Sequence, residues 1–97
     1  MVVEVSPILS SVAQELQLTE ADLLKQGARA LLERRLVQLR AELFQIYGRY
    51  GVRSVEEMET RYQEGTLDEA TSWRDFQRLD HLEFERDRLG KLLESLA

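Results

Sequence analysis

Two stretches of the chain repeat apolar residues every three or four positions, and this spacing constrains the fold more than any other feature. A heptad pattern of this kind is typical of a helix that buries one narrow stripe against another helix. The first stripe contains Leu32, Leu36, Leu39, Leu43, Ile46 and Tyr50, and the second contains Leu79, Leu82, Leu89, Leu93 and Leu96. The sequence therefore predicts two long helices that pack together along these seams.

Capping residues and glycines divide this single domain of 97 residues into four segments. Thr19 and Ser54 can cap helix starts, and Gly51 can end a helix in the left-handed conformation. Ser72 offers a cap for the last helix, although Thr66 to Glu69 could cap an earlier start. The expected segments are an arm and short helix over 1–18, a long helix over 19–51, a short helix over 54–65, and a C-terminal helix over 72–96. Within the arm, residues 2–5 could form a short strand.

These segments predict an all-α fold in which the two long helices form an antiparallel hairpin with a short crossing helix. Four aromatic residues lie off the seams and would be exposed to solvent in a two-helix monomer: Phe44, Tyr47, Phe76 and Phe84. Pairing two hairpins into a helical bundle would bury them. We therefore expect a homodimer.

The sequence contains no pattern that indicates catalysis or a cofactor. It has no Cys and a single histidine, His81, for which Glu85 is the only carboxylate placed on the same helix face. One such pair is too few to hold a metal ion tightly. We expect no catalytic, metal-binding or cofactor-binding residues. Because we find neither a signal peptide nor a membrane span, we expect a cytoplasmic protein.

Charge is distributed unevenly along the chain. Residues 1–50 carry six Lys/Arg and six acids, whereas residues 51–97 carry seven Lys/Arg and twelve acids, so the second half holds the whole net charge of −5. The acids on the last helix include Asp75, Asp80, Glu83 and Asp87. They predict a surface for a basic protein partner. The alternative is that these acids only keep the helix soluble.

Two further features of the last helix have alternative interpretations. Arg86 occupies a seam position, where its head could reach water or pair with a carboxylate such as Glu42. Trp73 and Phe76, with Tyr62 across the linker, form an aromatic group. This group could anchor a partner or could plug one end of the bundle.

The order of elements in the first forty residues resembles the ribbon-helix-helix layout of small bacterial antitoxins and repressors. In those dimers paired strands enter the major groove of DNA. Here the possible strand offers Val2, Glu4 and Ser6 in place of basic residues, and phosphate would repel Glu4. Nucleic-acid binding is therefore not the favoured prediction, although a DNA-binding regulator stays an alternative.

A second resemblance covers about residues 20–96. The segments that carry it include Tyr50-Gly51-Val52, Ser54-Val55-Glu56-Glu57, Gly65, Ser72-Trp73-Arg74-Asp75 and Leu79-Asp80-His81-Leu82-Glu83. They resemble a group of small helical proteins of archaea and cyanobacteria, some of which look like the antitoxin partner of a toxin. The resemblance implies a non-catalytic protein that binds another protein, as an antitoxin binds its toxin. The alternative is a structural or adaptor subunit without a toxin.

Overall fold

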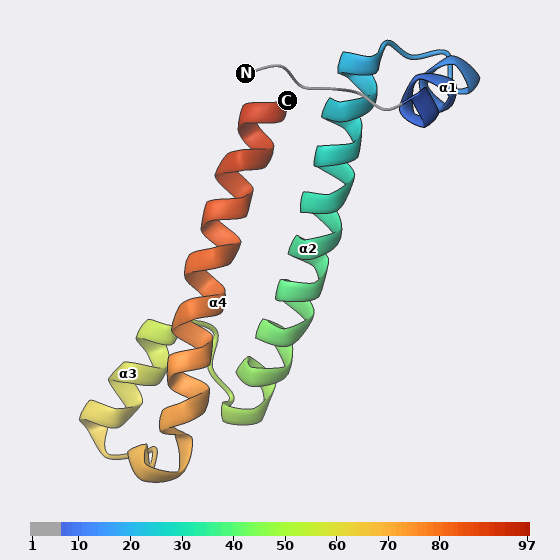
Figure 1. Ribbon diagram of the computed structural model, residues 1–97. Helices are drawn as coiled ribbons and strands as arrows, with labels where there is room; N and C mark the ends of the chain where they lie inside the picture. Colours follow the sequence, from blue (N-terminus) through green and yellow to red (C-terminus); the bar gives the residue numbers. More distant parts are fainter. Residues whose placement is uncertain (1–6) are drawn as a thin grey trace.

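The computed structural model describes residues 7–97, which form four helices in an elongated molecule of 60 × 25 × 21 Å (Figure 1). They are α1 (Pro7–Glu15), α2 (Glu20–Tyr50), α3 (Val55–Glu64) and α4 (Glu69–Leu96). Residues 7–97 contain no strand, which confirms the predicted all-α class for this part of the chain. The possible strand at 2–5 lies outside the described residues.

The two long helices, α2 and α4, run antiparallel and bury a shared core between them (Figure 1). Its most buried members from the predicted seams are Leu39, Leu79 and Leu82, at most 1% exposed. Leu36, Leu43, Ile46 and Leu89 are also buried, whereas Leu32, Tyr50 and Leu93 are partly buried at its edges. The predicted seams therefore meet within one chain.

Val52 and Met58 complete this core from the connection between the long helices. Gly51 ends α2 with a φ of 64°, a left-handed conformation that glycine adopts without steric cost. The turn brings Val52 back under α2, where its N–H donates to the Tyr47 carbonyl oxygen at 3.0 Å. The Ser54 side chain then caps α3 by accepting from the Glu57 N–H at 3.0 Å. The short helix α3 is thereby directed against α4.

Helix α4 begins at Glu69, three residues before the start expected at Ser72. The Asp68 side chain is its N-cap and accepts from the Ala70 N–H at 3.1 Å. Ser72 lies inside the first turn and is almost fully buried. Its hydroxyl donates to the Asp68 carbonyl oxygen at 2.7 Å and lies 2.5 Å from the Tyr62 hydroxyl. Ser72 therefore joins α4 to α3 and does not cap a helix.

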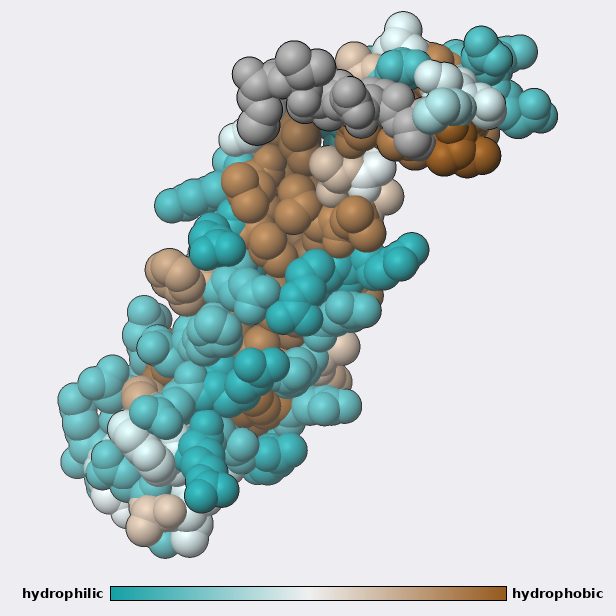
Figure 2. Space-filling model, in the orientation of Figure 1, coloured by the Kyte–Doolittle hydropathy of each residue, from teal (hydrophilic) through white to brown (hydrophobic). Residues whose placement is uncertain are grey.

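At the other end of the molecule, α2 extends beyond the C-terminus of α4 (Figure 1). Arg29 Nη2 donates to the Leu96 carbonyl oxygen at 2.5 Å, so α4 ends beside the third turn of α2. Helix α1 packs on the projecting part of α2 and buries Ala13. Hydrophobic side chains gather where α1, α2 and the end of α4 come together (Figure 2).

The four off-seam aromatic residues have two different environments. Phe44 and Phe84 are 78% and 66% exposed, as expected for a single hairpin. Tyr47 and Phe76 instead pack against the core, which the seam analysis did not anticipate. Phe76 packs against Tyr62 of α3, and the Tyr47 hydroxyl donates to Glu83 of α4.

No helix within residues 7–97 combines the length and the apolar character needed to cross a membrane.

Candidate interaction surfaces

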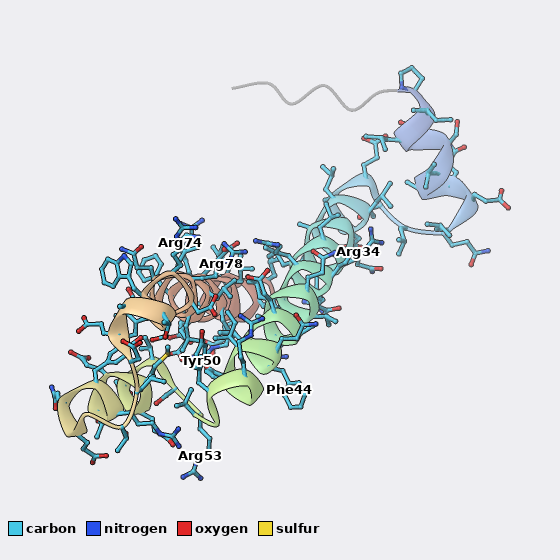
Figure 3. All side chains as sticks on the ribbon, turned by 90° about the horizontal axis from the view of Figure 1, so that it is seen from below. Arg34, Phe44, Tyr50, Arg53, Arg74 and Arg78 are labelled. Carbon is cyan, nitrogen blue, oxygen red and sulfur yellow. The ribbon has the colours of Figure 1, made fainter. Side chains whose placement is uncertain are left out.

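Asp75, predicted as part of a partner surface, is engaged within the chain. Its carboxylate accepts from Arg49 Nη1 at 2.6 Å and from the Tyr50 hydroxyl, both on α2. Figure 3 shows Tyr50 on the side of α2 that meets α4. The hydrogen bond from Tyr50, with help from Arg49, lowers the pKa of Asp75. Asp75 therefore holds the two long helices together near their connected ends.

Glu83 is also an internal acceptor, and it connects three helices. Its Oε2 accepts from the Tyr47 hydroxyl of α2 at 2.6 Å and from the Val55 N–H of α3 at 2.9 Å. The Val55 N–H is one of the first amides of α3 and has no partner within that helix. The Glu83 carboxylate also lies at the positive end of the α3 dipole. Glu83 thereby fixes α3 to α2 and α4.

The other two residues of the predicted acidic surface, Asp80 and Asp87, lie on the outside of the molecule. Asp80 is exposed, and Asp87 pairs with Arg86 Nε at 3.0 Å. The four carboxylates therefore do not form one free acidic face. The suggested pair of Arg86 with Glu42 is also wrong, because Glu42 accepts from Arg78 Nε at 2.5 Å and Nη2 at 3.1 Å. The hydrogen bond from Arg78 lowers the pKa of Glu42.

The Tyr47–Glu83 hydrogen bond predicts a loss of stability in alkali. Burial, with the hydrogen bond to Glu83, raises the pKa of Tyr47 to about 12, above its ordinary value of 10.0. The folded state therefore holds this proton more tightly than the unfolded state does. The contribution is fully present below pH 10 and is lost as the pH rises toward 12. We expect the free energy of unfolding, measured with urea at a series of pH values, to fall over this range. In Tyr47→Phe it should fall with a smaller slope against pH. An unchanged slope would contradict the assignment.

The predicted aromatic group assembles where α3 meets the start of α4. Tyr62 and Phe76 make an edge-on contact with ring centroids 5.5 Å apart, and Trp73 stacks on Phe76 at 6.5 Å. Tyr62 and Phe76 pack against the core, whereas Trp73 is about half exposed. Tyr62 and Phe76 therefore plug this end of the core. The outer face of Trp73 is left on the surface.

A stripe of small and apolar residues that the heptad seams did not predict lies on the side of α2 away from α4. We call it the outward seam of α2, and it consists of Leu23, Gly27, Ala30, Arg34, Val37, Ala41, Phe44 and Gly48. Val37 is 66% exposed, and Phe44 points away from α4 (Figure 3). The sequence signal was present, because these residues also recur every three or four positions. The repeat is less evident than in the leucine-rich seams because its glycine, alanine and arginine residues are small or polar.

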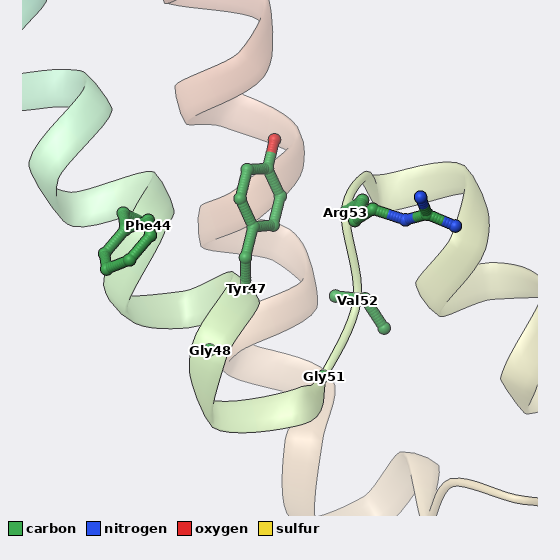
Figure 4. A pocket seen from close by; sticks show the side chains of 6 residues that line it. All are labelled: Phe44, Tyr47, Gly48, Gly51, Val52 and Arg53. Atoms are coloured by element: carbon green, nitrogen blue, oxygen red, sulfur yellow. The ribbon is translucent and has the colours of Figure 1, made fainter.

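Three hollows lie along this seam. A hollow of about 560 Å³ surrounds Gly27 and is lined by Leu9, Leu23, Leu24, Gly27, Ala28, Ala30 and Leu31. A second, of about 430 Å³, is lined by Phe44, Tyr47, Gly48, Gly51, Val52 and Arg53 (Figure 4). The third, of about 180 Å³, lies on the Arg40 side of Phe44. The Phe44 side chain therefore projects between two hollows near one end of α2, and the largest hollow lies near the other end.

Gly27 and Gly48 stand inside α2 where the fold of one chain does not require glycine. A Cβ atom added at either position would meet nothing within 4 Å. A glycine inside a helix costs about 1 kcal/mol relative to alanine. No contact within the described residues therefore offsets this cost.

His81 is exposed, and its Nε2 lies 3.5 Å from Glu85 Oε2. Glu85 also accepts from Arg35 Nε at 3.1 Å. Within residues 7–97 no group of three or more histidine or acidic side chains is placed to hold a metal ion.

The comparisons with known proteins identify a family but no function. The family model described as "Uncharacterized protein MJ0235 family" matches residues 1–97. No curated protein and no solved structure matches the chain significantly.

Proposed function

The chain belongs to the MJ0235 family, and for this member we propose a non-catalytic function in protein–protein interaction. In this proposal the protein acts as a homodimer that binds a further protein. The outward seam of α2 is the observation that carries the proposal. It is a stripe along the longest helix on the side away from α4. Helix α1 borders its Gly27 end through Leu9, whereas Ala30, Val37, Ala41 and Phe44 are exposed.

Both long helices display large side chains that water solvates poorly. Phe44 and Val37 lie on α2, and Phe84 and Trp73 lie on α4. Exposed aromatic residues bordered by hollows are typical of protein interfaces. Two faces on opposite helices would allow self-association through one and partner binding through the other.

Two more specific roles fit this proposal. An antitoxin-type protein would use its acidic half to bind a basic toxin, with the exposed Asp80 among the steering charges. An adaptor subunit would use the same surfaces in a larger assembly. The first role predicts a basic partner that binds less tightly as salt rises, because screening weakens exposed charges. A ribbon-helix-helix regulator would instead be recovered with DNA.

The test combines a mass measurement with capture from the native host. Light scattering of the full chain at micromolar concentration should give about twice the chain mass of 11.3 kDa. A tagged chain should then recover a defined protein from nuclease-treated lysate. The control bait carries Phe44→Ser and Phe84→Ser, which leave the core intact because both rings lie on the surface.

A monomer that captures nothing would contradict the proposal. So would equal recovery by the native bait and the control bait, because the exposed rings would then have no part in binding. Recovery of nucleic acid from lysate without nuclease, with no protein dependent on the rings, would favour the regulator.

A further inference from the structure

We propose that the outward seam of α2 binds the same seam of a second copy in antiparallel orientation. The twofold axis crosses the seam between Arg34 and Val37, at the level of Arg35 and Leu36 along the helix. This inference rests on the homodimer of the proposed function and names its interface. The occupant is a second copy because the seam is complementary to itself in size and in charge.

The size complementarity follows from reversing the helix direction. When two copies of α2 run antiparallel and overlap along their whole length, Phe44 lies opposite Gly27 and Leu23 lies opposite Gly48. Ala30 then lies opposite Ala41. Each glycine faces one of the larger side chains of the other copy, and the two alanines allow close approach. The interior glycines, which the single chain does not need, are accounted for by this pairing.

The hollows lie where these larger side chains would enter. The hollow around Gly27 would receive the Phe44 ring of the second copy, and the hollow beside Gly48 would receive its Leu23. Twofold symmetry makes each contact twice. With 31 residues in α2, the paired helices would share a seam about 45 Å long.

The central polar residue of the seam also has a place in this arrangement. Arg34 lies opposite Val37 of the second copy, so its aliphatic stem can cover the valine while its guanidinium stays in water. Arg34 is exposed in the single chain, and Val37 is 66% exposed. Burial of Val37 under this stem would require no buried charge.

The charges beside the seam select the antiparallel orientation. Glu33 and Arg40 flank the seam on the same side, and both are exposed. Neither makes a hydrogen bond or ion pair with a described residue. In the antiparallel pair Glu33 of each copy approaches Arg40 of the other, which gives two opposite-charge contacts. A parallel pair would set Phe44 against Phe44 and leave a void between two copies of Gly27.

The size complementarity provides the main test. Sedimentation equilibrium of the full chain over a range of concentrations measures the dimer dissociation constant. Gly27→Leu places a side chain in the hollow, where its Cβ atom meets nothing within 4 Å in one chain, and Phe44→Ala removes the side chain that enters the hollow. We expect each variant to raise the dissociation constant at least tenfold. The double variant exchanges the large and small residues and should recover most of the affinity. Circular dichroism should show native helix content throughout.

A cross-link tests the register independently, because the native chain contains no cysteine. Ala30→Cys combined with Ala41→Cys places the two thiols opposite each other across the axis, so oxidation should produce a covalent dimer. In either single variant the identical thiols of the two copies lie far apart along the paired helices. Oxidation of these variants should therefore produce little covalent dimer. Phe84→Ser is the matched control for loss of an exposed ring, and it should leave the dissociation constant unchanged.

The outcomes separate this inference from the proposed function. A native chain that is monomeric overturns both the inference and the homodimer, while a captured partner would preserve the interaction role. If the native chain is a dimer but neither Gly27→Leu nor Phe44→Ala raises its dissociation constant, only the inference is overturned. A dimer weakened by Phe84→Ser but not by Phe44→Ala would place the interface on α4 and would also overturn it.

Discussion

Leu79→Asp is expected to unfold the protein at room temperature. Leu79 is fully buried between α2 and α4, so the substitution removes a core side chain and leaves a carboxylate with no partner. Loss of the leucine contacts costs about 2–5 kcal/mol, and burial of the polar group adds to it. The sum approaches the whole stability of a domain this size, about 5–15 kcal/mol. Circular dichroism should show the loss of cooperative thermal unfolding.

Gln77→Asp is the matched control, because it introduces the same charge on the exposed side of α4. A change of two positions turns the side chain by about 200° around the helix, away from the core. We expect its melting temperature to stay within a few degrees of the native value. Similar melting of the two variants would mean that the α2–α4 core is assigned to the wrong face.

The antiparallel hairpin could be predicted because large apolar residues repeat at helical spacing in both long helices. Leucine at successive seam positions leaves little freedom in which face is buried. Caps such as Ser54 and the left-handed Gly51 located the connections, because each supplies a backbone requirement in a fixed local position. These features are local or periodic, and a sequence displays both directly.

The start of α4 was misplaced because two local signals compete. Asp68 and Ser72 are both good N-cap residues, and propensity alone does not choose between them. The choice is made by tertiary contacts, since Ser72 is buried beside Tyr62 of α3. A contact of this kind depends on how α3 packs, which local sequence does not specify.

The acidic surface was predicted incompletely for a related reason. Charge counting treats Asp75 and Glu83 as solvated residues of one helix face. Their partners, Tyr50 and Tyr47, lie on another helix, and only the register of α2 against α4 brings them together. Heptad spacing predicts that two helices pack but does not by itself fix their relative shift. Internal hydrogen bonds of this type therefore require the structure.

Glu83→Ala is expected to destabilise the protein by about 2–4 kcal/mol, because it leaves the partly buried Tyr47 hydroxyl and the Val55 N–H without their acceptor. The effect should concentrate at the start of α3, whose first turn loses both an amide partner and a favourable charge. Urea unfolding measures the total loss. Hydrogen exchange at the Val55 amide should increase by more than the global change in stability explains.

Asp80→Ala is the control, since Asp80 lies on the same helix and is exposed. Removal of its charge should change the free energy of unfolding by less than about 0.5 kcal/mol. Glu83→Gln should fall between the two, because the amide oxygen still accepts a hydrogen bond but carries no charge to interact with the α3 dipole. If Glu83→Ala and Asp80→Ala cost the same, Glu83 acts only as another surface acid. The junction of α2, α3 and α4 would then depend on its other contacts, such as the apolar packing of Val52 and Met58 and the Tyr62–Ser72 hydrogen bond.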